Sequence, residues 1–575
     1  MTTYIVFAAI LASLLLYAWI AAQSARQSRA NPDAFYLAQD TVSAPQFAMA
    51  QTAYQLQMAT IYPFFTFAFS GQWWLAALNT LFYMVGILLY LVCAGRFHSG
   101  RANLLGSSST VHAAIGNVHA SSSLRVFTAV LTILAFTGLA AFEIVWGATA
   151  LRVVFRGGMD LYYLTTAVLA AYLVMYVNTG GQPGNLRASE FQLLLCYLGL
   201  HSLVAWSALK SLPYMTLAPL RWLAMLIIGC SVVMFAYRIW VRRGGNGIVN
   251  LLTMTSVVGM VLLIGWTILS KASGAAVPPT PFSQAMPLGI LAAISVSVLP
   301  LTFQFVDMTN WQRIAALRAN PANLVKQTRL GLVQYLLESP LSWLLPIFLG
   351  LAASTFVHAG TGDKWMALLQ AVLLQSGLTG TVFAAIVFVG LIAVFMSTAD
   401  ELLAAIGYAF AYDVARRSRV IVDAGHRRGK PLSAQDTAIV FSYGRPAIWC
   451  SLAIIISAFI YLGNRFGVGV GQTFIGGFLA CYAPLAAMAP ALMIPGLFGR
   501  AASRTVAWLS IAIGAFSGLF FGIWSIFDPD ALHGAVNWLA PIVSMGLAWI
   551  IYLGGMAVAP TAKQHEMAEE SEAEA

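Results

Sequence analysis

The chain has 575 residues, of which 60% are hydrophobic and only 9% are charged, and its mean hydropathy is +0.80. This number of polar side chains is too small to cover the surface of a soluble globular protein. The composition therefore excludes a soluble protein and indicates a chain that lies in lipid. The net charge of +10 does not indicate nucleic-acid binding, because the basic residues are spread over short loops between apolar segments. The cysteines and histidines show no metal-ligand or redox spacing, so we expect no disulfide framework and no metal enzyme.

Apolar segments of about twenty residues recur along the chain, and this length lets a helix cross a hydrocarbon core of roughly 30 Å. Runs such as LLTMTSVVGMVLLIGWTIL are apolar on every face, which excludes the alternating strands of an outer-membrane barrel. The sequence therefore predicts an all-α polytopic membrane protein. Its fifteen expected spans are residues 3–23, 45–70, 73–95, 125–150, 161–178, 189–209, 219–239, 250–270, 286–306, 329–356, 380–412, 446–463, 469–495, 505–527 and 535–557.

The basic residues predict the orientation in the membrane. An odd number of spans places the two termini on opposite sides, and an outside N-terminus puts 23 of the 30 Lys and Arg residues in cytoplasmic loops. We therefore expect a multi-pass protein of the inner (plasma) membrane with its acidic tail, residues 561–575, in the cytoplasm. The longest polar stretches are too short to bury a core, so residues 1–560 are expected to form one transmembrane domain.

Span 380–412 carries four polar residues in an otherwise apolar segment: Ser397, Thr398, Asp400 and Glu401. Helical spacing places Ser397 on the same face as Asp400 and Glu401, one turn away. Hydroxyl and carboxylate oxygens are the ligands of hard cations, so the cluster predicts a sodium site. The two carboxylates equally allow a proton as the coupling ion, and hydrogen bonding between helices is the structural alternative.

Two further spans have interrupted patterns. Span 45–70 contains Gln51, Gln55, Gln57, Thr60, Tyr62 and Pro63, and span 286–306 contains Ser295, Ser297, Pro300 and Gln304. A proline removes a backbone donor, and free carbonyls at membrane depth persist only where they line a cavity. Interrupted helices in corresponding halves of a chain are typical of the solute and ion sites of secondary transporters.

Two glutamates also draw attention. Glu143 lies in the middle of span 125–150, where it could contact a solute, carry a proton or bond a neighbouring helix as a neutral acid. Glu190 opens span 189–209, where it could belong to a polar site or favour the positive end of the helix dipole.

Several motifs together resemble the solute:sodium symporter family. MSTADELLAAIGYAFAYDV, which ends near Asp413, resembles the family's helix with a small-residue and hydroxyl run. DMTNWQRIAALR resembles its segment of Asp, Gln and Arg, and GGQPGNLRASEFQ is similar to its double-glycine segment. The resemblance spans roughly residues 1–560.

The resemblance implies a leucine-transporter-like fold of two inverted five-helix repeats, here approximately 45–209 and 286–495, with an inserted helix pair at 219–270. It implies that Ser397 and Thr398 ligate sodium together with backbone carbonyls near Val394, Tyr54 and Gln57. Glu190, Asp400 and Glu401 would lie where some relatives place a second sodium.

We therefore expect a sodium-coupled symporter of a small polar solute, with sugar, amino acid and carboxylate all open, and no enzymatic activity. The expected solute-binding residues are Gln55, Gln57, Tyr62, Glu143, Ser297 and Gln304. The alternatives are a proton-coupled transporter of the same fold and a sensor that signals through the basic loop 414–437. Beyond solute and membrane lipid, no nucleic-acid or obligate protein partner is expected.

Overall fold

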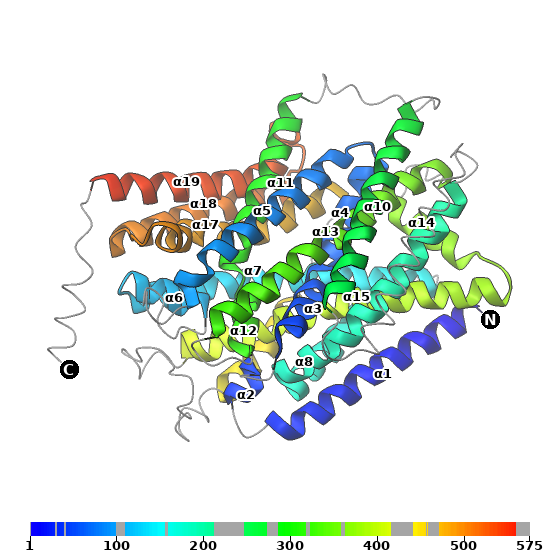
Figure 1. The fold of residues 1–575 in the computed structure, drawn as a ribbon, viewed down its shortest axis with the longest axis horizontal. Coiled ribbons are helices and arrows are strands. Elements are labelled where there is room, and N and C mark those ends of the chain that lie inside the picture. Colours follow the sequence, from blue (N-terminus) through cyan, green and yellow to red (C-terminus); the bar gives the residue numbers. More distant parts are fainter. Residues whose placement is uncertain are drawn as a thin grey trace.

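The computed structural model describes residues 2–28, 32–38, 42–98, 110–155, 159–211, 246–272, 286–317, 323–357, 363–415, 441–455, 457 and 471–558. These residues form helices and one isolated bridge, between Val42 and Leu317. Ten of the described helices are long and apolar enough to cross a membrane. The chain is thus an all-α polytopic membrane protein (Figure 1).

The helices follow one another along the chain as α1 (Thr2–Ser28), α2 (Pro32–Leu37), α3 (Ala44–Gln55), α4 (Met58–Phe69), α5 (Trp73–His98), α6 (Val111–Val118), α7 (Ser122–Phe155), α8 (Met159–Ser211), α10 (Asn246–Ala272), α11 (Met286–Val306), α12 (Met308–Ala316), α13 (Leu324–Phe356), α14 (Lys364–Leu373), α15 (Gly377–Ala409), α17 (Gly471–Phe498), α18 (Arg504–Phe527) and α19 (Val536–Val558). A π-helical turn, η2 (Phe410–Ala415), continues α15, and a short 3₁₀ turn, η4 (Ala531–Gly534), precedes α19.

The predicted spans coincide with these helices where the structure describes them. Span 219–239 lies outside the described residues, and of span 446–463 the helical part up to residue 455 is described. Helix α8 joins two predicted spans, 161–178 and 189–209, across a kink at Gly181. Gly181 has a φ of +57°, and a Cβ there would lie 2.5 Å from the Phe35 carbonyl oxygen, so only glycine fits this kink.

The first interrupted span is broken as predicted, but the second is not. Helices α3 and α4 are separated at Leu56 and Gln57, whereas Pro63 lies inside α4. The expectation of an interruption within 286–306 is wrong, because α11 stays helical through Pro300. The break comes after it, at Asp307, whose carboxylate accepts the backbone N–H of Thr309 at 2.9 Å and so caps α12.

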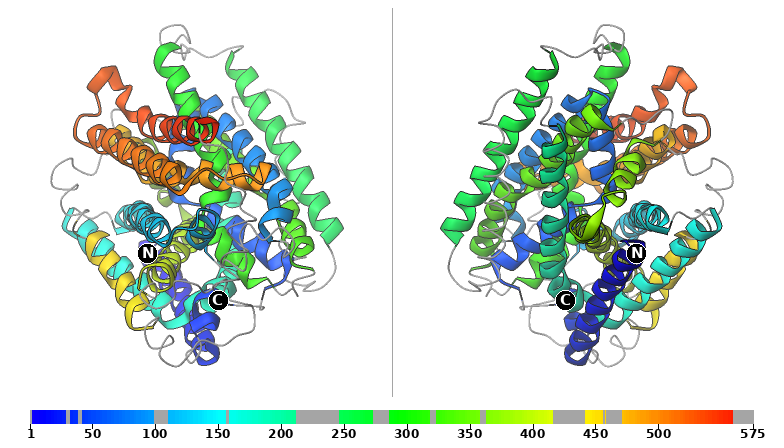
Figure 2. Two further views of the ribbon diagram at one scale, coloured as in Figure 1. Left: turned by 90° about the vertical axis from the view of Figure 1, so that its left-hand side faces the viewer. Right: turned by 90° about the vertical axis from the view of Figure 1, so that its right-hand side faces the viewer.

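Helix α15 runs through the middle of the molecule and packs against α1, α7 and α8. Its contact with α8 is close, since a Cβ on Gly390 would lie 2.6 Å from the Cα of Gly199. Helices α17, α18 and α19 pack together on one side of the molecule, and α1 and α8 lie on the opposite side (Figures 1 and 2). The start of α1 and the end of α19 lie at opposite ends of the bundle (Figure 1).

Candidate functional site

The break between α3 and α4 is held open by a glutamate from another helix. Gln57, the N-cap residue of α4, makes no side-chain cap. Instead the fully buried carboxylate of Glu143 on α7 accepts the backbone N–H groups of Met58 at 3.0 Å and Ala59 at 2.9 Å. These N–H groups have no partner within their own helix, and a carboxylate also complements the positive end of the helix dipole. Glu143 therefore positions the start of α4.

On the other side of the break, the end of α3 meets the hydroxyls of α15. The Ser397 hydroxyl oxygen lies 2.8 Å from the carbonyl oxygen of Ala53 and 2.9 Å from that of Val394. The Thr398 hydroxyl donates to the carbonyl of Tyr54 at 2.9 Å. All five residues are buried. The arrangement gathers at least five uncharged oxygen atoms from two helices at membrane depth, a ligand set that suits a hard monovalent cation.

One turn along α15, the acid pair Asp400 and Glu401 is fully buried and faces amides of α8. The Gln182 side-chain amide donates to Glu401 at 2.9 Å, and the Gln192 amide donates to Asp400 at 3.0 Å. The Asn185 amide binds the Asp400 backbone carbonyl at 3.0 Å. Five acceptor oxygens in this cluster have no hydrogen-bond partner among the described residues: Asp400 Oδ1, Glu401 Oε1, Gln182 Oε1, Asn185 Oδ1 and Gln192 Oε1.

Arg313 on α12 supplies the positive charge of this cluster. Its Nη2 lies 3.3 Å from Glu401 Oε1, and its Nη1 donates to Gln51 Oε1 of α3 at 2.6 Å. Its guanidinium carbon also lies 4.7 Å from the centre of the Tyr54 ring. The Arg313 side chain is fully buried, so it ties α3, α12 and α15 together on the α3 side of the break.

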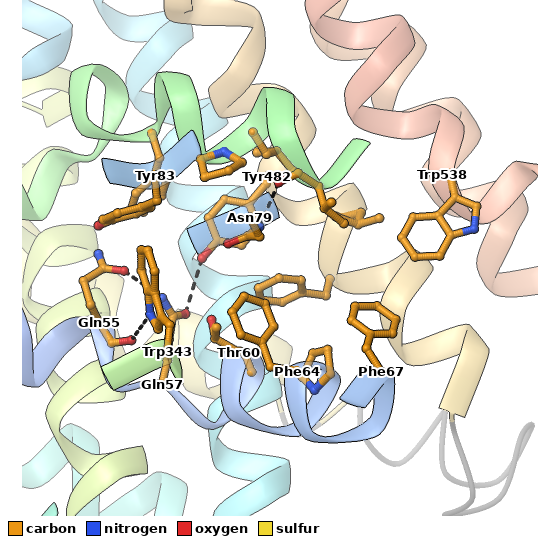
Figure 3. Close-up of a pocket in the computed structure, with 18 residues that line it drawn as sticks. Gln55, Gln57, Thr60, Phe64, Phe67, Asn79, Tyr83, Trp343, Tyr482 and Trp538 are labelled. Carbon is orange, nitrogen blue, oxygen red and sulfur yellow. Dashed lines mark hydrogen bonds between the residues drawn. The ribbon is translucent and has the colours of Figure 1, made fainter. Parts of the chain in front are cut away.

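A cavity of about 710 Å³, counted out to its opening, lies on the α4 side of the break. Figure 3 shows Gln55, Gln57 and Trp343 at one end of it and Phe67 and Trp538 at the other. Its lining comes from α3, α4, α5, α11, α13, α17 and α19, and it includes no charged residue. Its mostly apolar lining, rich in aromatic side chains and with a few polar groups, is typical of a small-molecule site.

The other predicted site residues lie in different places. Gln55 and Gln57 line the cavity, while the Gln57 carbonyl accepts N–H groups in the first turn of α4. Tyr62 stacks on Trp146 with 3.9 Å between ring centres, and its hydroxyl donates to Asp363 at 3.3 Å.

Ser297 and Gln304 lie on α11, outside the residues that line the cavity. The Ser297 hydroxyl donates to the Ala293 carbonyl in its own helix. The Gln304 carbonyl accepts the Asn310 amide across the break at Asp307. Glu190 accepts the Gln46 amide at 2.8 Å in an exposed position, whereas its neighbour Gln192 reaches Asp400.

A second charged cluster fixes the far end of α15. Asp413 is fully buried and accepts from Arg125 Nε at 2.7 Å and from the Thr110 hydroxyl at 3.0 Å. His112 Nδ1 lies 2.8 Å from its other carboxylate oxygen. These contacts join α6 and α7 to η2.

The sequence left several of these residues out of the predicted site. Arg313 was singled out only as part of a motif, and its place beside Glu401 depends on how α12 and α15 meet. Ala53 offers a backbone carbonyl, which no side-chain pattern reveals. Asn79, Trp343 and Tyr482 line the cavity from three separate helices, so their meeting has no signature in any one segment.

No described protein family and no curated protein matches this sequence. Among solved structures, the fold is similar to that of a Na⁺-coupled sialic acid symporter in a substrate-bound outward-open state, with a TM-score of 0.60 and 12% sequence identity over 97% of this chain and 99% of that chain. A manganese transporter of Eremococcus coleocola is a weaker match, with a TM-score of 0.43 and 14% identity over 90% and 93% of the two chains. The likeness to the sialic acid symporter shows that the two chains share a fold.

Proposed function

We propose that this protein is a secondary active transporter that moves a small polar solute across the inner membrane by alternating access, coupled to sodium. The observation that carries the proposal is the meeting of the Ser397 and Thr398 hydroxyls with the carbonyls of Ala53 and Tyr54, at the point where a membrane helix is broken. The shared fold with a Na⁺-coupled symporter and the motifs that resemble the solute:sodium symporter family support it.

The oxygen atoms at this point suit sodium as a transported substrate. Each hydroxyl can rotate its hydrogen away, so that the Ser397 and Thr398 oxygens and the carbonyls of Ala53 and Val394 turn together toward one cation. All four are uncharged, so the ion can leave again once the helices part. Sodium held there would tie α3 to α15.

The two sides of the break differ in the way that alternating access requires. The cavity lies beside α4, and the α3 side is closed by the buried contacts of Arg313 with Glu401 and Gln51. With the N-terminus outside, the cavity faces the exterior and the Arg313 contacts close the cytoplasmic side. Sodium and solute are coupled if both favour this same conformation, since a ligand shifts an equilibrium only by its differential affinity.

A proton is the second candidate for the coupling ion. Asp400 is fully buried, and its Oδ1 has no hydrogen-bond donor among the described residues. A buried carboxyl group is more stable when it is protonated and neutral, because burying the charged carboxylate costs free energy. The cluster around Asp400 could therefore carry a proton in place of a sodium ion.

Thermal unfolding of the purified protein in detergent tests the choice of ion. Sodium should raise the unfolding temperature over potassium at equal ionic strength, because a ligand of the folded state stabilises it by about 2.7 kcal/mol at 100 times its Kd. The variant with Ser397→Ala and Thr398→Val should lose this difference. Thr166→Val is the matched control, since the Thr166 hydroxyl donates to the carbonyl of Tyr162 within its own helix.

An equal sodium effect in the double variant would contradict the site. A protein that ignores sodium, but whose stability changes with pH in a way that Asp400→Asn abolishes, would instead favour the proton.

A further inference from the structure

The helix start that could bind a solute anion is already occupied. In discontinuous transporter helices, the N-terminus of a half-helix is the natural place for an anionic group, because its N–H groups and its dipole both favour negative charge. Here the two N–H groups at the start of α4 are bound by the Glu143 carboxylate. Ala59, one of these two residues, also lines the cavity.

No other group in the cavity replaces this anion site. The lining includes no Lys, Arg or His. Arg313 lies on the α3 side, where Gln51 and Glu401 hold its guanidinium, so it is not directed at the cavity. A carboxylate or phosphate would therefore lose its hydration without gaining a charged partner, which is costly.

The polar atoms of the cavity are arranged for an acceptor of hydrogen bonds. Gln57 Nε2 donates to Gln55 Oε1 at 3.3 Å, and the Tyr482 hydroxyl donates to Gln57 Oε1 at 3.3 Å. At the end of this series of hydrogen bonds, Gln55 Nε2 has no hydrogen-bond partner among the described residues, although Gln55 is only 1% exposed. A buried N–H donor that lacks an acceptor is costly, so the solute is expected to present an uncharged oxygen there.

Aromatic side chains make up much of the apolar part of the cavity. Trp343, Tyr83 and Phe303 line it near the amides, and Tyr83 meets Trp343 edge to face with 4.0 Å between ring centres. Aromatic faces pack well against flat apolar surfaces. They would also attract a cation, but no carboxylate lines the cavity to neutralise one, and the unpaired donor of Gln55 would repel it.

We propose that the solute is uncharged, with hydroxyl or carbonyl oxygens on one edge and a flat apolar face, because Glu143 fills the anion position of the broken helix and no charge lines the cavity. This inference rests on the proposed function, since it takes the cavity to be the transport site. It excludes amino acids and carboxylates and keeps hydroxylated rings.

Sets of related solutes that differ in charge test the inference on the wild-type protein. Glucose, glucosamine and glucuronate form one such triplet, and inositol with inositol phosphate and a nucleoside with its monophosphate form two matched pairs. Thermal unfolding is recorded with each at equal concentration, in sodium and in potassium. We expect an uncharged member to raise the unfolding temperature most. The inference would be overturned if a charged member raised the unfolding temperature most within its set, or if no uncharged member stabilised the protein.

The occupied helix start has its own test in Glu143→Ala. This substitution removes a CH₂ and a carboxylate, which together have the size of acetate. We expect sodium acetate, compared with sodium chloride, to raise the unfolding temperature of Glu143→Ala but not that of the wild type. Acetate that stabilises both proteins equally, or neither, would overturn the assignment. If Glu143→Ala does not fold, the solute sets are measured again with Glu143→Gln, which keeps the shape and one acceptor but removes the charge. We expect the anionic solutes to rise in rank relative to the wild type, and an unchanged ranking would contradict the assignment.

The two proposals fail in different ways. Uncharged solutes that bind equally in sodium and potassium would contradict sodium coupling and leave the charge inference standing. A carboxylate that binds only in sodium would do the reverse.

Discussion

Replacing Arg313 tests how strongly its buried ion pair with Glu401 stabilises the α3 side of the helix break. Arg313 and Glu401 are both fully buried, so Arg313→Met leaves the Glu401 carboxylate with the Gln182 amide and without a positive charge. Breaking a buried ion pair in this way costs about 3–5 kcal/mol. Glu401→Gln should cost a similar amount, because it leaves the guanidinium without its anion.

The double variant should lose less than the sum of the two single variants. Neither charge then remains buried without a partner, and a coupling of about 0.5–3 kcal/mol is expected for groups in one network. The assay is reversible unfolding in mixed detergent micelles, measured for the wild type, both single variants and the double variant. Lys210→Met, which changes an exposed cation, is the control and should have little effect. Additive losses would refute the view that these charges depend on each other.

Three further predictions concern the kink, the cavity and the far end of α15. Gly181→Ala should lower the unfolding temperature strongly, because its Cβ would lie 2.5 Å from the Phe35 carbonyl oxygen, whereas Gly265→Ala has open space around it and should not. Tyr482→Phe should weaken the binding of whichever solute of the panel binds best, because the lost hydroxyl donates to Gln57 in the cavity. The rise of the unfolding temperature in sodium should not change, because this hydroxyl does not contact Ser397. Loss of that rise would contradict the view that the cavity and the sodium site are separate. Asp413→Asn should destabilise the purified protein by about 1.5–3 kcal/mol, because the charge-assisted hydrogen bond from the partly exposed Arg125 is lost. The exposed Asp528→Asn is the control, and equal midpoints of unfolding would show that the cluster contributes little.

The membrane helices were predictable because hydrophobic length alone specifies them. The segment that became α8 shows the limit of that signal: its two spans were separated correctly, yet only the structure shows that Gly181 joins them with a positive φ. The break before α4 was expected from its glutamines and Pro63. The position of the break instead follows from Glu143, which binds the N–H groups of Met58 and Ala59. These contacts join residues that are 85 and 84 positions apart in the sequence.

The second break was misplaced because proline does not by itself end a membrane helix. Pro300 removes one backbone donor, and α11 continues past it, whereas Asp307 ends the helix by capping the next one. A capping carboxylate followed by Thr309 was the better signal in this sequence.

The candidate ion site was partly predictable and partly not. Ser397 and Thr398 stand out as hydroxyls in an apolar helix, and the structure places them against the end of α3. Glu190 was expected near the acid pair because of its charge and its motif. Helical geometry turns Glu190 toward Gln46 and turns Gln192 toward Asp400, and the sequence offered no means to choose between these two neighbours.

Direct binding of radioactive sodium to the purified protein is the measurement that tests the central claim most closely. We expect saturable binding to the wild type and to Thr166→Val, competed by unlabelled sodium and not by potassium, and no saturable binding to the variant with Ser397→Ala and Thr398→Val. Saturable binding that survives in the double variant, or its absence from the wild type, would contradict a sodium site at the break between α3 and α4.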